Sequence, residues 1–491
     1  MLPARERLSS RELIKFGIRE LGQGLVVAST ISYLYKAGLV EPLHASSLDH
    51  PIVLDEESSR IRRVAADCMV GVNVLSLDGH GYYLKSGGKA HLLEPANVAI
   101  AVSLMDKLKP LEDPEAFDKQ DILGLMAGYK DDLSGVPNEL KGALVIPINA
   151  MIHHARGVGI NTRDYIRQAD GKQMVDQWLR PLCEIYLSDQ DPAGRLVDRF
   201  TKRLALSAPW ARFDYSYLRL HRNLHEVESG AVIYGFGAEQ PGKLRIDRMQ
   251  PHNAEATKEW LDIHVSPALA ELALTLAGEP KAGNVTVVDA GSGAGGLLAQ
   301  VAHAFEGNPG QLTIVHSDID RETRKPAQEL FASKGIDAQI EWHIGDLMNR
   351  SHLAELKQLV EQKTKPGLVL FCMNYILQEF GDEQIDEFLE SFRSVLGDWL
   401  FAITENWTLG LKNAGYYGQD VPFLALHGYS GQNLQRREAF LKRLGGYGFL
   451  RPEFLTAKES ELVHIDIPDP EHPMDKDKRI ITNSTLVVQC Q

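Results

Sequence analysis

The sequence predicts a mixed α/β chain whose C-terminal half contains a mostly parallel sheet. From residue 284 onward, short apolar runs alternate with helical patterns, which is typical of parallel strands connected through helices. The first run passes straight into a glycine-rich turn, VVDAGSGAGG, which predicts a strand followed directly by a helix. This spacing predicts a doubly wound, Rossmann-like domain that binds a ligand at the carboxyl ends of its strands. Seven strands are predicted, at 285–291, 312–318, 338–346, 367–374, 400–406, 461–467 and 484–491.

A different pattern precedes this domain. Residues 10–40 contain two helical patterns, an amphipathic stretch lies near 56–70, and two short alternating strands with glycine turns follow. Three helices and a β-ribbon in this order predict a winged-helix-like start. Residues 96–230 are amphipathic and helical almost throughout. We therefore predict a winged-helix-like domain at 1–95, a helical lid or substrate domain at 96–254 and the Rossmann-like domain at 255–491.

Composition limits the classes of function. A chain of 491 residues is longer than one core usually fills, and its net charge of -14 argues against a surface that neutralises nucleic-acid phosphates. The N-terminus has no apolar signal-peptide region, and no apolar run approaches the length of a bilayer span. The sequence therefore predicts a cytoplasmic protein with no nucleic-acid or membrane partner. The chain has four cysteines, Cys68, Cys183, Cys372 and Cys490. They form no CxxC pair, and this favours a reducing compartment.

The turn after the first predicted strand carries the strongest signal for a ligand. Gly291, Gly293 and Gly295 allow a sharp turn and a close backbone approach, and the next helix offers free N–H groups at its N-terminus. With Gly296 the turn also satisfies GxGxxG, so an NAD-dependent oxidoreductase is an alternative at this point. Asp289, two residues before the first glycine, is placed to organise the loop and attract a cationic ligand.

Acidic residues also end the next two predicted strands. HSDID places Asp318, with Asp320 as its neighbour, where a ribose diol would meet a carboxylate, and GDLMN places Asp346 and Leu347 near an adenine ring. These acidic strand ends, in this order, resemble the class I S-adenosylmethionine (SAM)-dependent methyltransferases. The resemblance implies an enzyme that uses SAM, with Asn374 after the fourth strand as a further cofactor contact. No proton-relay arrangement of Lys, Tyr or His near that strand supports the oxidoreductase alternative.

The segment after the fourth strand narrows the resemblance. ILQEFGDE is similar to the ILHDWSDE segment of small-molecule O-methyltransferases with an N-terminal winged-helix dimerisation domain. This similarity implies a homodimer and a small-molecule substrate, and the unusually large front domain indicates a role in specialised metabolism. In that family the histidine of the segment is the general base, and this chain has Gln378 in its place. Because an amide has no useful basicity, histidine-assisted O-methylation is not expected.

Gln378, Glu379 and His427 form the predicted catalytic and metal-binding set. An amide, a carboxylate and an imidazole leave open positions on one iron or manganese ion, which resembles the metal-dependent C-methyltransferase branch acting on 2-oxo acids or carrier-bound acyl groups. A metal there would stabilise an enolate without a strong protein base. Metal-assisted C-methylation is therefore the favoured function. Predicted substrate contacts lie near the fourth and fifth strand ends: Tyr375, Asn406, Trp407, Phe423 and Tyr429.

Two further alternatives stay open. A metal-independent O- or N-methyltransferase would use another base, such as Glu379 or His427. A winged-helix regulator with a ligand-sensing, inactive methyltransferase-like domain would instead bind duplex DNA, which the acidic composition disfavours.

Overall fold

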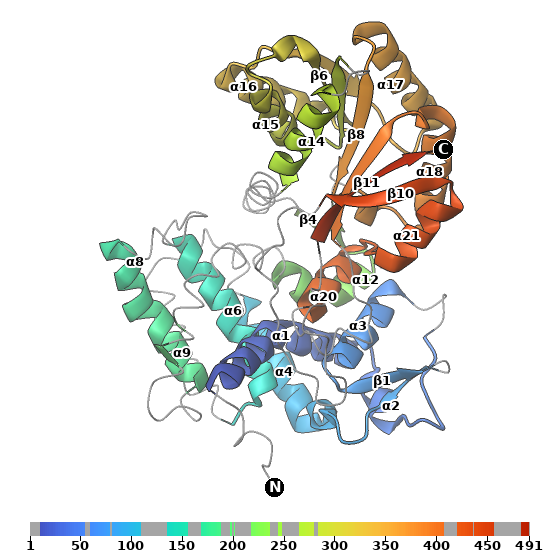
Figure 1. Ribbon diagram of the computed structural model, residues 1–491. Helices are drawn as coiled ribbons and strands as arrows, with labels where there is room; N and C mark the ends of the chain where they lie inside the picture. Colours follow the sequence, from blue (N-terminus) through green and yellow to red (C-terminus); the bar gives the residue numbers. More distant parts are fainter. Residues whose placement is uncertain are drawn as a thin grey trace. The chain divides into compact units, whose positions relative to one another are not determined.

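The chain forms two compact units (Figure 1). The first unit comprises Met1–Ala256 and Gly410–Gly431, and the second comprises Thr257–Leu409 and Gln432–Gln491. This division falls beside the predicted start of the Rossmann-like domain at 255, and it assigns 410–431 to the first unit. The computed structural model describes residues 10–54, 59–78, 81–109, 135–155, 168–187, 197–198, 201, 218–235, 244–247, 265–278, 283–406, 420–435, 437–455 and 483–490.

The first unit is mostly helical. The two helical patterns at 10–40 form a single helix of 27 residues, α1, rather than two comparable helices. Within the described part of the chain, no helix combines the length and the apolar character that a bilayer span requires. The elements of the first unit are α1 (Ser10–Lys36), α2 (Val40–Ala45), α3 (Arg60–Gly71), β1 (Leu75–Asp78), β2 (Gly81–Leu84), η2 (Ala90–Leu93), α4 (Pro95–Lys107), α6 (Asn138–Ala155), α8 (Ala169–Met174), η5 (Val175–Leu179), α9 (Arg180–Leu187), α12 (Leu224–Glu228), β3 (Val232–Gly235), β4 (Leu244–Asp247) and α20 (Asp420–Ser430).

The start of this unit contains the predicted β-ribbon and a helix over the predicted amphipathic stretch near 56–70. Helices α1, α2 and α3 are followed by β1 and β2, which pair antiparallel. Tyr82 on β2 donates a hydrogen bond from its hydroxyl to Asp67 Oδ1 on α3, at 2.6 Å, and so ties the ribbon to the helix. The winged-helix interpretation of this order stays a prediction.

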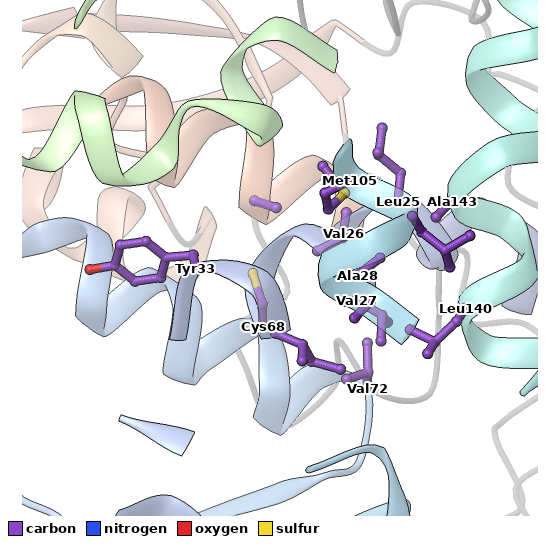
Figure 2. Packing of buried hydrophobic residues seen from close by; sticks show 14 of the residues in the cluster. Leu25, Val26, Val27, Ala28, Tyr33, Cys68, Val72, Met105, Leu140 and Ala143 are labelled. Atoms are coloured by element: carbon purple, nitrogen blue, oxygen red, sulfur yellow. The ribbon is translucent and has the colours of Figure 1, made fainter. Parts of the chain in front are cut away.

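Helix α1 lies at the centre of the first unit's core. From Leu25 to Leu34 it is buried at successive positions, and Figure 2 shows its side chains packed with residues of α3, α4 and α6. Gly24 explains how close α6 comes, because a Cβ added there would lie 2.5 Å from the Cα of Gly142. Buried polar groups join further elements to α1: Thr30 Oγ1 pairs with Tyr429 Oη of α20 at 2.8 Å, and Ser29 Oγ pairs with His221 Nδ1.

The second unit contains a sheet of seven strands in the order β10-β11-β9-β8-β5-β6-β7. The five strands β5 to β9 are parallel, and β11 runs antiparallel to both of its neighbours. The predicted α/β class and mostly parallel sheet are therefore confirmed. The strands are β5 (Val285–Ala290), β6 (Leu312–Asp318), β7 (Gln339–Ile344), β8 (Leu368–Asn374), β9 (Leu400–Asn406), β10 (Phe449–Leu455) and β11 (Asn483–Cys490).

The sixth strand of the sheet differs from the prediction. It is β10, at Phe449–Leu455, a segment for which the sequence analysis assigned no strand. The predicted strand at 461–467 lies outside the described residues. The final predicted strand is confirmed as β11, which fits between β9 and β10.

Helices cover both faces of this sheet, and Figure 1 shows α14, α15 and α16 on one side and α17, α18 and α21 on the other. Strand β5 needs this cover on both faces, because all its residues are buried. Val285 and Val287 lie in one core, and Val288 and Ala290 lie in the other. A strand buried on both faces reads as the continuous apolar run seen in the sequence. The helical elements are α14 (Ser266–Gly278), α15 (Gly296–Ala304), η7 (Pro309–Gln311), η8 (Arg321–Thr323), α16 (Arg324–Lys334), α17 (Arg350–Lys363), η9 (Leu377–Glu379), α18 (Asp382–Leu396) and α21 (Arg437–Gly446).

Candidate functional site

The glycine-rich turn after β5 is built as the sequence predicts a ligand loop to be. Gly291, Gly293 and Gly295 all have positive φ, of 73°, 53° and 76°, a region that favours glycine. A Cβ at Gly291 would lie 2.5 Å from Ile376 Cδ1, and one at Gly295 would lie 2.7 Å from Phe331 Cζ. A Cβ at Gly293 would meet nothing within 4 Å. Two of the glycines therefore allow close packing inside the protein, while the third faces open space.

Asp289 lies beneath this turn, next to the last residue of β5, and is 4% exposed. Its Oδ2 accepts a hydrogen bond from Ser292 Oγ at 3.0 Å, and its Oδ1 accepts one from Asn374 Nδ2 at 3.4 Å. Burial raises the pKa of the Asp289 carboxyl to about 7, and the Asp318 carboxylate adds to the rise. A cationic ligand would favour the ionised form of this carboxyl and lower its pKa.

Asp318, the last residue of β6, holds the turn from the neighbouring strand. Its Oδ2 accepts a hydrogen bond from Gly293 N at 2.8 Å, and its Oδ1 accepts one from Asp320 N at 2.9 Å. Asp320 itself caps η8, because its Oδ1 accepts the Glu322 N–H at 2.9 Å. Asp318 is thus joined directly to the glycine turn, whereas the contacts of Asp320 belong to a helix cap.

Asp346 and Leu347 follow β7. Asp346 Oδ1 accepts the Met348 N–H at 2.9 Å, and the Asp346 N–H donates to His352 Nδ1 at 3.0 Å. Gly345 N donates to Asp318 O at 3.0 Å, so the turn after β7 is tied to the carboxyl end of β6. Leu347 is 9% exposed.

Residues 375–379, after β8, are held at four points. Tyr375, which has φ of 58°, donates from N to Thr404 O at 2.8 Å, and Leu377 N donates to Glu405 Oε1 at 2.7 Å. Gln378 O accepts the Asn433 N–H at 2.6 Å, and Glu379 Oε1 accepts from Gln432 Nε2 at 2.7 Å. These bonds fix the short helix η9 against β9 and against the segment that follows α20.

The end of β8 and this fixed segment still leave two acceptors unused. Asn374 Oδ1 and Gln378 Oε1 are buried, and neither has a hydrogen-bond partner among the described residues. A buried amide oxygen without a partner costs about 1–3 kcal/mol. A ligand that brings N–H or O–H donors would remove this cost.

The remaining predicted residues belong to two different units of the chain. His427 and Tyr429 lie in α20 of the first unit, where His427 is 5% exposed and Tyr429 is fully buried with its hydroxyl paired to Thr30. Phe423 is also in α20, and Asn406 ends β9. Trp407 lies outside the described residues. The second unit by itself therefore contains two of the three predicted catalytic residues, Gln378 and Glu379.

Several residues of the second unit were missed by the sequence analysis. Ser317 O accepts the N–H groups of Gly291 and Ser292, at 2.9 and 3.1 Å, and His316 Nε2 bonds Gly293 O at 2.8 Å. The signal was present, because HSD puts His316 and Ser317 directly before the acidic residue. Glu405, 3% exposed, was missed because nothing in the sequence indicates that it holds η9.

Comparison with known proteins gives a partial match. No family model matches the chain. The biotin biosynthesis bifunctional protein BioHC of Teredinibacter turnerae is 24% identical over 311 residues, which cover 58% of this chain and 52% of that protein. The chain thus spans about half the length of this curated relative.

Two solved structures resemble the chain at low overall similarity. An O-methyltransferase family protein from Burkholderia thailandensis has 13% identity and a TM-score of 0.38, over 83% of this chain and 99% of that one. The DszA carbon methyltransferase has 14% identity and a TM-score of 0.39, over 78% of this chain and 96% of that one. At such scores the fold assignment depends on the strand order and directions described above, which are those of a mostly parallel, doubly wound sheet.

Proposed function

We propose that the chain is a SAM-dependent methyltransferase that acts on a small molecule. The observation that carries the proposal is the hydrogen-bonded arrangement at the carboxyl ends of β5 and β6, where a buried carboxylate lies under an open glycine turn and a second carboxylate holds that turn. Asp289 and the unpartnered Asn374 Oδ1 suit a ligand that carries positive charge and N–H donors. When bound, SAM supplies an electrophilic methyl group.

The chemistry of η9 restricts the acceptor. Gln378 can accept or donate a hydrogen bond, but it cannot take a proton from a substrate at neutral pH. Glu379 is the nearest basic group in sequence, and its carboxylate already accepts from Gln432 Nε2. The residues of this segment therefore orient a substrate, and substrates whose acceptor atom is already nucleophilic, such as carboxylates and amines, are the first to test.

The donor set does not favour a metal within the second unit. In the described part of the chain, no three His, Cys, Asp or Glu side chains are grouped as ion ligands would be. Gln378 is neutral, Glu379 is engaged by Gln432, and His427 belongs to the first unit. We derive no step through a metal, and C-methylation of a 2-oxo acid or acyl substrate stays a prediction, as does O- or N-methylation.

The experiment is a comparison of SAM with NAD. We expect SAM to raise the melting temperature of the purified protein, NAD to leave it unchanged, and Asp289→Ala to abolish the effect of SAM. Turnover is then measured as S-adenosylhomocysteine released with carboxylic acids, amines, phenols, 2-oxo acids and acyl thioesters. Stabilisation by NAD instead of SAM would show that the proposal is wrong. Salt-dependent binding of duplex DNA without turnover would favour the regulator alternative.

Homodimerisation, a cytoplasmic location and a carrier-bound substrate remain further predictions for this chain. Light scattering during size-exclusion chromatography measures whether the chain forms a homodimer.

A further inference from the structure

Two histidines lie behind the turn that follows β7. His343 is on β7, where it is paired in register with Ser317 of β6, and His352 is in the first turn of α17. Gly345 lies between them: a Cβ added there would be 2.4 Å from His343 Cε1 and 3.0 Å from His352 Cβ. The two side chains thus leave no room for anything larger than glycine at this position.

His343 connects this turn to the glycine-rich turn. Its Nδ1 bonds Ser317 Oγ at 2.9 Å, and Ser317 O accepts the N–H groups of Gly291 and Ser292. Burial lowers the pKa of His343, and its Nε2 has no hydrogen-bond partner among the described residues. A buried imidazole in this setting is neutral at physiological pH.

His352 acts on the other end of the turn. Its Nδ1 accepts the backbone N–H of Asp346 at 3.0 Å, which requires that this nitrogen carry no proton. The Asp346 side chain is then held from the other direction, because its Oδ1 accepts the Met348 N–H. Backbone and side chain of Asp346 are therefore fixed by separate bonds, and the backbone bond depends on His352.

We propose that His352 is a positioning residue for the cofactor. Its ring accepts the Asp346 N–H and holds the Asp346–Leu347 turn in the conformation that binds the adenine end of SAM. The inference rests on the proposed SAM-binding function and goes beyond it, because it assigns a role to a side chain outside the predicted contacts.

The test is isothermal titration of the full chain with SAM, using four proteins. At about pH 7.5, His352→Ala should weaken SAM binding about tenfold, because it leaves a backbone donor unpaired. His352→Asn keeps an acceptor near the position of Nδ1 and should stay within about twofold of the wild type. The matched control is His303→Ala, since His303 is an exposed histidine of the same unit that pairs with Glu306.

Rescue by asparagine separates positioning from packing. His352→Asn restores an acceptor without the imidazole ring, so SAM binding should recover if the acceptor holds the Asp346 turn. Equal Kd values for wild type and His352→Ala, or a His352→Asn variant as weak as His352→Ala, would overturn the proposal.

The outcomes also separate this inference from the proposed function. If the wild type itself does not bind SAM, the proposed function fails and the role of His352 fails with it. If the wild type binds SAM and His352→Ala does not fold, the Kd of His352→Asn still decides the question: a value within about twofold of the wild type supports the role of the acceptor, and a much weaker one overturns it.

Discussion

The two halves of the sheet's carboxyl edge differ in how far their polar groups are already satisfied. Beneath the turns after β5, β6 and β7, Asp289, Asp318 and Asp346 each accept hydrogen bonds from neighbouring groups of the protein. After β8, by contrast, Asn374 Oδ1 and Gln378 Oε1 are buried without partners among the described residues. The difference indicates that the turns after β5, β6 and β7 are preorganised, whereas the region around the end of β8 and η9, with the predicted cofactor contact Asn374 and the predicted catalytic residue Gln378, completes its hydrogen bonds only with a ligand.

The largest effect should come from breaking the preorganised half at Asp289. We expect Asp289→Ala to weaken SAM binding about 100-fold, because it removes a buried carboxylate from a cationic ligand. Titration calorimetry measures the loss. Asp398→Ala is the matched control, since Asp398 contacts Lys357 on the surface of the same unit and should leave the Kd unchanged. A wild-type Kd in Asp289→Ala would contradict our assignment of the cofactor half.

Two glycines of the same turn should separate folding from binding. Gly291→Ala combines positive φ with a 2.5 Å approach to Ile376 Cδ1, so it should lower the melting temperature by roughly 3 °C or more without ligand. Gly293→Ala meets open space and should cost less stability while still reducing SAM affinity. Differential scanning calorimetry and titration of both variants test this order. The reverse order of stabilities would show that Gly293, not Gly291, is the packed position.

The η9 segment after β8 is tested by a matched pair of glutamines. Gln378→Met removes a buried amide oxygen that has no partner among the described residues, and should raise the unfolding free energy by about 1 kcal/mol. Gln384→Met removes a cap, since Gln384 Oε1 accepts the Gly381 N–H at 2.9 Å, and should lower it by about 1 kcal/mol. Denaturant titration gives both values. If Gln378→Met is the more destabilising of the two, the amide of Gln378 is satisfied in the free protein.

The smallest expected effect is a proton released when SAM binds. The pKa of Asp289 is raised to about 7 in the folded chain, so its contribution to stability is greatest in acid and decreases as the pH rises through about 7. A cationic ligand favours the ionised form of the Asp289 carboxyl. Below about pH 7, binding of SAM should therefore release a fraction of a proton. Calorimetry in buffers of different ionisation enthalpy measures it. The same release in Asp289→Asn would assign the proton to another group.

The sequence was most informative where local chemistry determines structure. The apolar run of β5 leads into its glycine turn, and the acidic residues at 289, 318 and 346 lie at or just beyond strand ends, which in a parallel sheet lie at one edge. β10 was not predicted, because its run FLRPEFL contains charged residues and a proline that are unusual for a strand. Nothing near His427 in sequence indicates that α20 packs on α3 and belongs to the first unit.

That last feature bears on the order in which the chain is made. Helix α20 completes the first unit's core: Val421 packs against Gly71 of α3, and Tyr429 bonds Thr30 of α1. During synthesis it emerges only after β5 to β9 of the second unit. Although domains generally fold as units from the N-terminus, the first unit here must wait for a helix translated after most of the second unit's sheet. The first unit therefore cannot reach its final structure before most of the second unit's sheet has been translated.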